Sequence, residues 1–259
     1  MTDLSLKIGG EAGQGLQAIG YVLARSVAMG GLYVFANQDN ESRIRGGHNF
    51  FQVRVSDRPI QAISEKIHVL VALDGRSIAE HSEELVEDGV VVFDGEKVGK
   101  PDLNGNFLSV PLERLANEKT GRLIMANSVA VGAILGLMKY DFSTLESVLN
   151  DAFKARGAEV VQKNIEAARA GYDYVAEHSS IEFGYSLKRT SRTTDRLLLS
   201  GNEVLASSAL ISGCKFMSGY PMSPSIPIQQ FFASKMREFN VVFEQAEDDL
   251  ALAPHVRGV

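Results

Sequence analysis

The hydrophobic pattern of the first half of the chain alternates strand-like and helix-like segments. Short apolar runs at 4–10, 32–37, 49–56, 67–73 and 89–94 predict strands, and segments at 15–31 and 74–89 predict helices. The runs IHVLVAL and GVVVFD are rich in β-branched residues, which is typical of parallel strands covered on both faces. This alternation predicts an α/β fold with a doubly wound, largely parallel sheet.

The pattern changes near residue 127. Three consecutive helices are expected at 127–140, 143–156 and 159–178, and they close a first domain of residues 1–178. Residues 179–196 are rich in Ser, Thr and Arg without periodicity, so we expect a solvated linker.

A second α/β pattern then begins in residues 197–259. Strands are expected at 196–201, 215–221 and 241–245, and helices at 202–213, 223–239 and 246–253, with Asn202 as an N-cap. Three short strands cannot form a sheet covered on both faces, so this domain is expected to be incomplete.

Composition narrows the function classes. The net charge of -6 is spread along the chain, which argues against nucleic-acid binding. No apolar run reaches membrane-spanning length and no signal peptide is visible, so we expect a cytoplasmic protein without membrane association. The single cysteine, Cys214, excludes internal disulfides and any cluster held by several thiolates of this chain. The five histidines are scattered without ligand spacing, so we predict no metal site, and any redox metal is expected on another chain.

A glycine loop joins the first strand to the first helix and admits two interpretations. Residues Gly13–Ala18 (GQGLQA) match the G-x-G-x-x-A pattern of dinucleotide-binding proteins, with Asp39 as the nearest candidate for a ribose-binding acid. Alternatively, Gly9, Gly10, Gly13 and Gly15 only let the strand turn tightly into a closely packed helix. The dinucleotide interpretation fails if Asp39 points away from the loop.

A second marked stretch is SRIRGGHNFFQVRVSD. Arg43 and Arg45 precede Gly46 and Gly47, so the arginines could bind an anion or a partner chain. They could equally anchor a turn that needs the two glycines. We favour a turn or an interface over a catalytic role.

Taken in order, GGEAGQGLQ, SRIRGGHNFFQVRVSD, MANSVAVGAILGL, SGYPMSPS and FEQAEDDLA resemble the alpha subunit of 2-oxoacid:ferredoxin oxidoreductases. The resemblance is strongest to the 2-oxoglutarate type, in which a gamma domain precedes a pyrimidine-binding domain. It implies a Rossmann-like gamma domain that binds no nicotinamide or flavin, followed here by a truncated α/β domain of the thiamine-diphosphate type. The four loop glycines would then be structural.

The resemblance also implies an activity and partners. The family couples oxidative decarboxylation of a 2-oxoacid to coenzyme A and passes the electrons to ferredoxin. Thiamine diphosphate is shared with a separate beta subunit, and magnesium and an iron–sulfur cluster belong to partner chains. Because the second domain is expected to be incomplete, we expect no activity from this chain alone. Its uncovered apolar surface is expected to associate with the beta subunit or with a second copy.

Two residues carry the implied site. Glu247, in EQAEDD, matches the family glutamate that hydrogen-bonds the aminopyrimidine ring, although acids are also common at helix N-termini. Ser223, in YPMSPS, stands where the family has a threonine whose hydroxyl contacts the 2-oxoacid, but Ser223 or Ser225 could instead cap a helix. The other functions left open are a Rossmann-like dinucleotide-binding protein and a non-catalytic assembly module.

Overall fold

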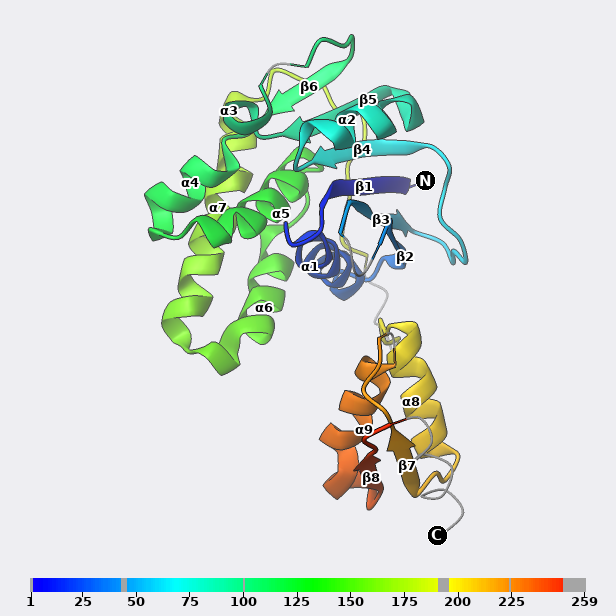
Figure 1. The fold of residues 1–259 in the computed structure, drawn as a ribbon. Coiled ribbons are helices and arrows are strands. Elements are labelled where there is room, and N and C mark those ends of the chain that lie inside the picture. Colours follow the sequence, from blue (N-terminus) through cyan, green and yellow to red (C-terminus); the bar gives the residue numbers. More distant parts are fainter. Residues whose placement is uncertain (1, 43–45, 100, 191–195, 224, 249–259) are drawn as a thin grey trace. The chain divides into compact units, whose positions relative to one another are not determined.

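The computed structural model describes residues 2–42, 46–99, 101–190, 196–223 and 225–248. The chain forms two compact units, Met1–Asp195 and Arg196–Val259, which are described separately below (Figure 1).

The first unit is built on one six-stranded sheet in the order β2-β3-β1-β4-β5-β6 (Figure 1). Its strands are β1 (Asp3–Glu11), β2 (Tyr33–Asn40), β3 (His48–Ser56), β4 (Ile67–Ala72), β5 (Leu85–Phe93) and β6 (Asn106–Ser109). Strands β1, β4, β5 and β6 pair in parallel, whereas β3 lies antiparallel between β1 and β2. The predicted α/β fold with a mostly parallel sheet is confirmed, and the reversed strand β3 is an addition to it.

The two faces of the sheet differ in chemistry around β1. Helix α1 (Leu16–Met29) packs on the face that carries Ile8 and Phe51, and Gly20 lets the helix approach the Phe51 ring. The opposite face carries buried polar side chains, among them Ser5 and Gln52. Gln52 donates hydrogen bonds to Ser5 Oγ at 3.0 Å and to the Ser64 carbonyl at 2.6 Å. The short helix α2 (Gly75–His81) packs on this second, polar face.

Four further helices longer than one turn follow the sheet: α4 (Leu112–Thr120), α5 (Ala126–Leu137), α6 (Phe142–Phe153) and α7 (Ala158–His178); the one-turn α3 (Gly95–Val98) precedes β6. Helix α5 is apolar all round and almost wholly buried, as expected for a helix enclosed by others. Its Gly132 faces the Ala168 backbone of α7, and Gly171 of α7 faces the Val129 backbone. The two helices therefore touch through backbone at positions where no side chain fits.

The expected helix at 74–89 is shorter than predicted. Helix α2 ends at His81, a single 3-10 turn covers Ser82–Glu84, and β5 already begins at Leu85, which pairs with Ile67. Pairing with β4 overrides the helical preference of the acidic residues near 83–88. Strand β6 and helix α4 were not predicted from the sequence.

Residues 179–190 contain neither helix nor strand, yet they are not solvated as a tether would be. Phe183 and Leu187 are buried, and the Leu187 N–H donates to the Met138 carbonyl at 3.1 Å. Thr190 bonds the turn after α1, its N–H to Gly30 O at 2.9 Å and its hydroxyl to Gly31 O at 2.9 Å. This stretch is therefore fastened to the first unit.

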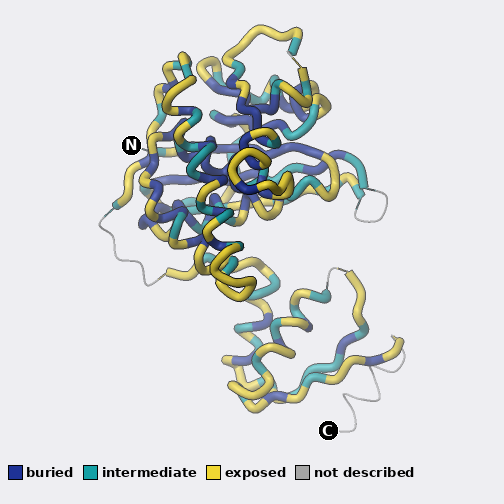
Figure 2. Tube along the Cα trace, turned by 90° about the vertical axis from the view of Figure 1, so that its left-hand side faces the viewer, coloured by how far each residue is buried: buried dark blue, intermediate teal, exposed yellow. Residues whose placement is uncertain are grey.

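The second unit is small. It contains α8 (Gly201–Ile211), β7 (Phe216–Gly219), α9 (Ile226–Phe239) and β8 (Val242–Gln245), and β7 pairs with β8 in parallel. Its buried core consists of Ala206, Leu210, Phe232 and Val241. Figure 2 shows the contrast: buried residues run along the strands of the first unit, whereas exposed and half-buried residues dominate the second.

Two expectations for the second unit are wrong. Residues 196–199 form no strand, and Leu197 is 81% exposed, because the described part of the unit offers this segment no pairing partner. The N-cap of α8 is Ser200 rather than Asn202, since Ser200 and Glu203 form a reciprocal capping box. In the described part of the chain, we find no helix with the length and apolar character needed to span a membrane.

Candidate functional site

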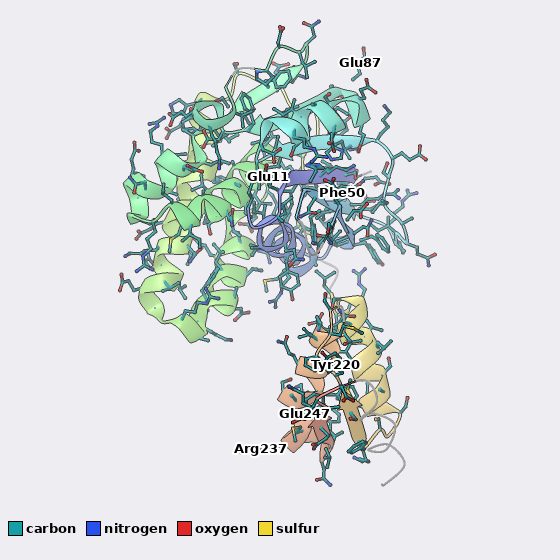
Figure 3. All side chains as sticks on the ribbon, viewed as in Figure 1. Glu11, Phe50, Glu87, Tyr220, Arg237 and Glu247 are labelled. Atoms are coloured by element: carbon teal, nitrogen blue, oxygen red, sulfur yellow. The ribbon has the colours of Figure 1, made fainter. Side chains whose placement is uncertain are left out.

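Ser223 and Glu247 follow neighbouring parallel strands at the same edge of the small sheet. Ser223 lies in the loop after β7 and Glu247 lies two residues after β8. Gly219 and Gln245 are paired in register, and the Ala246 N–H donates to Gly219 O at 3.1 Å. The carboxyl edge of parallel strands is where open α/β sheets place their ligands. Figure 3 labels Glu247 together with Tyr220, which begins the loop after β7.

Hydrogen bonds from the Gln229 side chain hold the loop after β7 in place. This buried amide donates to the Tyr220 carbonyl at 2.7 Å and to Ser225 Oγ at 3.0 Å. A side chain at Gly219 would collide with Gln229, its Cβ lying 2.7 Å from the amide carbon. The loop that carries Ser223 therefore has a fixed base, although the Ser223 side chain is itself exposed.

Neither serine caps α9 through its hydroxyl in the described residues. Ser225 occupies the N-cap position, but it makes no side-chain cap hydrogen bond and its hydroxyl instead donates to Met222 O at 2.7 Å.

Glu247 is exposed, whereas the implied role favours a sheltered carboxyl group. The reason is architectural, because a two-stranded sheet leaves its carboxyl edge open to water. Residues 246–248 are not helical, and the rest of the helix expected at 246–253 lies outside the described residues.

The glycine loop of the first unit has a mainly steric explanation. Gly15 is the N-cap of α1 with φ of 83°, a conformation that favours glycine, and a Cβ there would strike the Asn127 amide. A Cβ on Gly9 would lie 2.8 Å from Ser77 Oγ, and one on Gly10 would strike Gln14. Gly13 has φ of 93° and open space around it.

Asp39 points away from this loop. Its neighbour Gln38 reaches α1, where it accepts a hydrogen bond from Gln17 Nε2 at 2.7 Å. Successive strand residues point to opposite faces, so Asp39 faces the other side of the sheet. In addition, β3 separates β2 from β1.

A groove of 360 Å³ beside the loop is lined by Gln17, Gln38, Asn40 and Asn49 and by no carboxylate among the described residues. The arrangement of a dinucleotide site is therefore not formed.

The second glycine pair directly precedes β3. Gly47 has φ of 106°, and a Cβ there would collide with the Glu41 carboxylate, which accepts a hydrogen bond from the His48 N–H at 2.8 Å. Gly46 has φ of 76°. Arg43 and Arg45, predicted as anchors or interface residues, lie outside the described residues.

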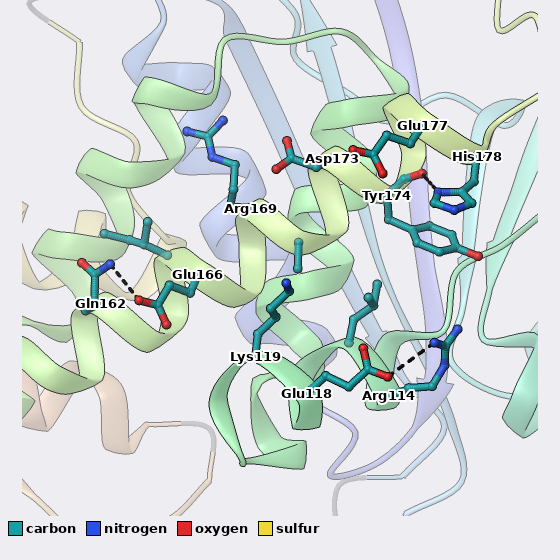
Figure 4. A pocket seen from close by; sticks show the side chains of 13 residues that line it. Arg114, Glu118, Lys119, Gln162, Glu166, Arg169, Asp173, Tyr174, Glu177 and His178 are labelled. Atoms are coloured by element: carbon teal, nitrogen blue, oxygen red, sulfur yellow. Dashed lines mark hydrogen bonds and ion pairs between the residues drawn. The ribbon is translucent and has the colours of Figure 1, made fainter.

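Another groove, with a volume of 740 Å³, lies between α4 and α7 (Figure 4). Acidic and basic side chains alternate along it and pair locally, such as Arg114 with Glu118 at 3.4 Å. None of the predicted site residues lines it. The mixed charge gives this groove no preference for a ligand of either sign.

The structure brings two histidines together that the sequence analysis treated as scattered. His48 begins β3 and His81 ends α2, and their Nε2 atoms are 2.8 Å apart. The antiparallel insertion of β3 creates this contact, and a prediction of parallel strands alone could not place it. A polar residue such as Lys7 in an otherwise apolar strand was the available signal that this face is not a hydrocarbon interior.

Residues 5–174 match the family model of pyruvate ferredoxin/flavodoxin oxidoreductases. The chain is 24% identical to a 2-oxoacid:ferredoxin oxidoreductase alpha subunit from a Sulfolobus species over 96% of this chain and 46% of that protein. It is 28% identical to the 2-oxoglutarate synthase subunit KorC of Methanocaldococcus jannaschii over 66% of this chain and 94% of that subunit.

Solved structures agree. A 2-oxoglutarate:ferredoxin oxidoreductase from Magnetococcus marinus matches with a TM-score of 0.86 and 25% identity, over all of this chain and 46% of that one. An oxoacid ferredoxin oxidoreductase gamma subunit from Geobacter sulfurreducens matches with a TM-score of 0.59 and 26% identity, over 68% of this chain and 98% of that subunit.

The chain thus spans about half the length of the curated alpha subunits it matches, and a whole gamma-type subunit corresponds to about two thirds of it. The family resemblance drawn from the five motifs is confirmed. This chain belongs to the pyruvate ferredoxin/flavodoxin oxidoreductase family.

Proposed function

We propose that this chain acts as the alpha subunit, or part of it, of an enzyme that oxidatively decarboxylates a 2-oxoacid, forms an acyl-coenzyme A and passes electrons to ferredoxin. The observation that carries the proposal is the alignment of nearly the whole chain with alpha subunits, which extends through both units. A gamma-type subunit alone would account for only the first unit.

Within this proposal, Glu247 and Ser223 have separate tasks. The Glu247 carboxyl group would hydrogen-bond the aminopyrimidine ring and hold a proton there. The Ser223 hydroxyl donates a hydrogen bond to the 2-oxoacid. Their positions after adjacent parallel strands give both side chains access to one ligand-binding edge.

The described residues fit only the pyrimidine half of a thiamine diphosphate site. They provide a carboxylate and a hydroxyl at the edge of β7 and β8. The diphosphate and its magnesium ion require further oxygen ligands, which we assign to the beta subunit, together with the iron–sulfur cluster. When bound, the cofactor supplies the electron sink that decarboxylation needs.

The test uses the beta subunit together with an alpha chain of the full length of the relatives, because this chain spans about half of that length. We expect reduction of a viologen dye that depends on 2-oxoglutarate, coenzyme A and added thiamine diphosphate. Replacing Glu247 by Gln should lower kcat by at least about 100-fold, the range typical of general acid–base groups. Ser223→Ala should mainly raise KM for the 2-oxoacid, with a smaller change in kcat.

Two results would decide against the proposal. Normal turnover by Glu247→Gln would remove the glutamate from the site. A stable complex with no 2-oxoacid-dependent reduction would favour the non-catalytic assembly module. Asp248→Asn is the matched control, because Asp248 is the exposed neighbour of Glu247 and has no assigned role.

A further inference from the structure

A buried histidine pair lies on the polar face of the first unit, and the function proposed above uses neither histidine. His48 and His81 are 7% and 6% exposed, and their ring centroids are 5.0 Å apart. Gly9 of β1 makes the approach possible, since a Cβ there would lie 2.8 Å from Ser77 Oγ of α2 and 3.4 Å from His48 Cε1. The missing side chain lets α2 and the start of β3 meet over β1.

The proton positions on His81 follow from its partner. His81 Nδ1 is 2.7 Å from Glu84 Oε1, and a carboxylate can only accept, so Nδ1 carries the proton. Lys7 forms an ion pair with the other oxygen of Glu84 and keeps that carboxylate in place. His81 Nε2 therefore presents its lone pair to His48. A carboxylate behind the ring is the arrangement that orients histidine ligands in metal sites.

A third ligand atom converges on the pair. Glu80 Oε1 accepts a hydrogen bond from Arg76 Nε at 2.6 Å, while Glu80 Oε2 lies 3.7 Å from His48 Nε2. The ligand atoms of His48, Glu80 and His81 all lie within 4.8 Å of one another. In a tetrahedral zinc site with bonds of about 2.0–2.1 Å, neighbouring ligand atoms are about 3.3 Å apart. The His48 Nε2–His81 Nε2 separation of 2.8 Å is about 0.5 Å shorter than this, and the His48 Nε2–Glu80 Oε2 separation of 3.7 Å is about 0.4 Å longer, so small side-chain shifts bring these atoms to tetrahedral spacing.

We propose that His48, Glu80 and His81 bind one divalent transition-metal ion, for which zinc is the best match. Two imidazoles and one carboxylate are a ligand set that zinc accepts with a fourth position left for water. The Glu80 side chain is 40% exposed, so the ion has a path from solvent. On the closed side, the Phe50 ring packs edge-on against His81, with centroids 5.5 Å apart. The ion would tie β3 to α2 across the end of β1.

The competing interpretation is a metal-free hydrogen bond from His48 Nε2–H to His81 Nε2. It explains the 2.8 Å separation but gives Glu80 Oε2 no purpose and makes the pair indifferent to added metal. The charged side chains around the histidine pair also favour a bound cation. Glu41, Glu80 and Glu84 outnumber Lys7 and Arg76 around the pair, so a dication compensates an excess of negative charge.

Metal titration of the chelator-treated full chain distinguishes the two. We expect one zinc ion bound per chain, a visible absorption band of tetrahedral cobalt when cobalt replaces zinc, and a rise in melting temperature on adding zinc. His81→Ala should weaken zinc binding by at least about 100-fold and abolish the zinc-dependent rise. Glu84→Gln should weaken binding by about 10–100-fold, because Glu84 positions the ring without contacting the ion.

His178→Ala is the control, since His178 is exposed on α7 and stacks on Tyr174 away from the cluster. It should bind zinc like the unmodified chain. If His81→Ala does not fold, Glu80→Gln carries the test, because this partly exposed side chain can change without opening the core, and binding should fall at least about 10-fold. Absence of zinc binding, or equal binding by all variants, would overturn the site.

Discussion

The sequences of the two units begin with the same alternation of apolar runs and helices, but the units differ in how completely they bury their apolar side chains. In the first unit, Val69, Leu70 and Val71 of the central strand β4 are fully buried, and β4 pairs with β1 on one side and β5 on the other. In the second, no residue of β8 is buried, and Ile211 of α8 is 79% exposed. A strand pattern thus predicts that a segment can be buried, but only the number of neighbouring elements decides whether it is.

The energetic consequence follows from core size. Among its described residues the second unit buries five apolar side chains, four of them in one cluster, and domains below about 70–80 residues gain little net stability from a single core. We therefore expect it to unfold separately from the first unit and under milder conditions. Each prediction below tests this difference by a paired substitution or a change of pH.

The largest effect should come from removing a core aromatic of the second unit. Phe232→Ala deletes the ring that packs among Ala206, Leu210 and Val241, at a cost of about 3–5 kcal/mol. This cost exceeds the free energy of unfolding that we expect for so small a unit. Amide hydrogen exchange should therefore show α8 and α9 unprotected while β4 stays protected.

The matched change in the first unit is Phe142→Ala. Phe142 is also buried and lies edge-on to Tyr172 with centroids 5.3 Å apart. Here we expect a lower unfolding midpoint but a folded unit, because the remaining core is large. Equal loss of protection in both units after Phe232→Ala would show that they unfold together.

The next effect concerns the contact between α5 and α7. Gly132→Ala places a methyl group against the Ala168 backbone, where only a shift of one helix relieves the collision. Overpacking of this kind costs about 1–3 kcal/mol, and we expect the upper part of this range because the obstacle is backbone. Denaturant unfolding of the first unit measures it.

Gly201→Ala is the helical counterpart in the second unit. A Cβ there meets nothing within 4 Å, so we expect no loss and a gain of up to about 1 kcal/mol from the restricted unfolded chain. If Gly132→Ala proved equally harmless, the close approach of α5 and α7 would be wrong.

These pairs also show what the sequence could and could not reveal. Strands β1, β3 and β4 and helices α1, α5, α6 and α7 were predicted close to their observed bounds, because their apolar periodicity is long and strong. Leu85–Asp88 were assigned to a helix, since local composition says nothing of pairing with β4. The strand predicted at 196–201 is wrong for the complementary reason. The local pattern favours a strand, but this segment pairs with no strand among the described residues.

The candidate site also has features that the sequence predicted and features that it could not predict. The motifs placed Ser223 and Glu247 after two strands, and the parallel pairing of β7 with β8 puts both at one edge. Their roles remain predictions. The exposure of Glu247 was not foreseeable, since it depends on which chain covers the edge. His48 and His81 could not be paired from the sequence, because their contact depends on the direction of β3.

A smaller effect should appear in the pH dependence of the first unit. Burial lowers the pKa of His68 below its ordinary value of 6.5, although the charges of Asp88 and Asp3 act in the opposite direction. The unfolded chain therefore takes up this proton at a higher pH than the folded chain does. Stability contributed by neutral His68 is present above pH 6.5 and is lost as the pH falls through the lower, folded pKa.

The measurement is the free energy of unfolding between pH 7.5 and about pH 5, compared with His68→Gln. The variant should lose less stability over this interval than the unmodified chain, and the two curves should run parallel above pH 7. An identical slope in both would mean that His68 is protonated equally in the folded and unfolded states. His68 lies in the first unit, so His68→Gln should leave the pH dependence of the second unit's unfolding unchanged.

The smallest effect is predicted at Ile211, and it addresses the comparison most directly. Ile211 and its neighbour Leu210 are both large and apolar, but Leu210 is 5% exposed and Ile211 is 79% exposed. Leu210→Ala should cost about 2–3 kcal/mol, whereas Ile211→Ala should change the free energy of unfolding by less than about 0.5 kcal/mol. Such an isoleucine contributes nothing to folding of the isolated chain. If α8 meets the beta subunit in the proposed complex, Ile211→Ala should weaken assembly while leaving the chain's own melting curve unchanged. A loss of stability at Ile211 comparable to that at Leu210 would instead show that this face is already covered within the chain, and the contrast between the two units would disappear.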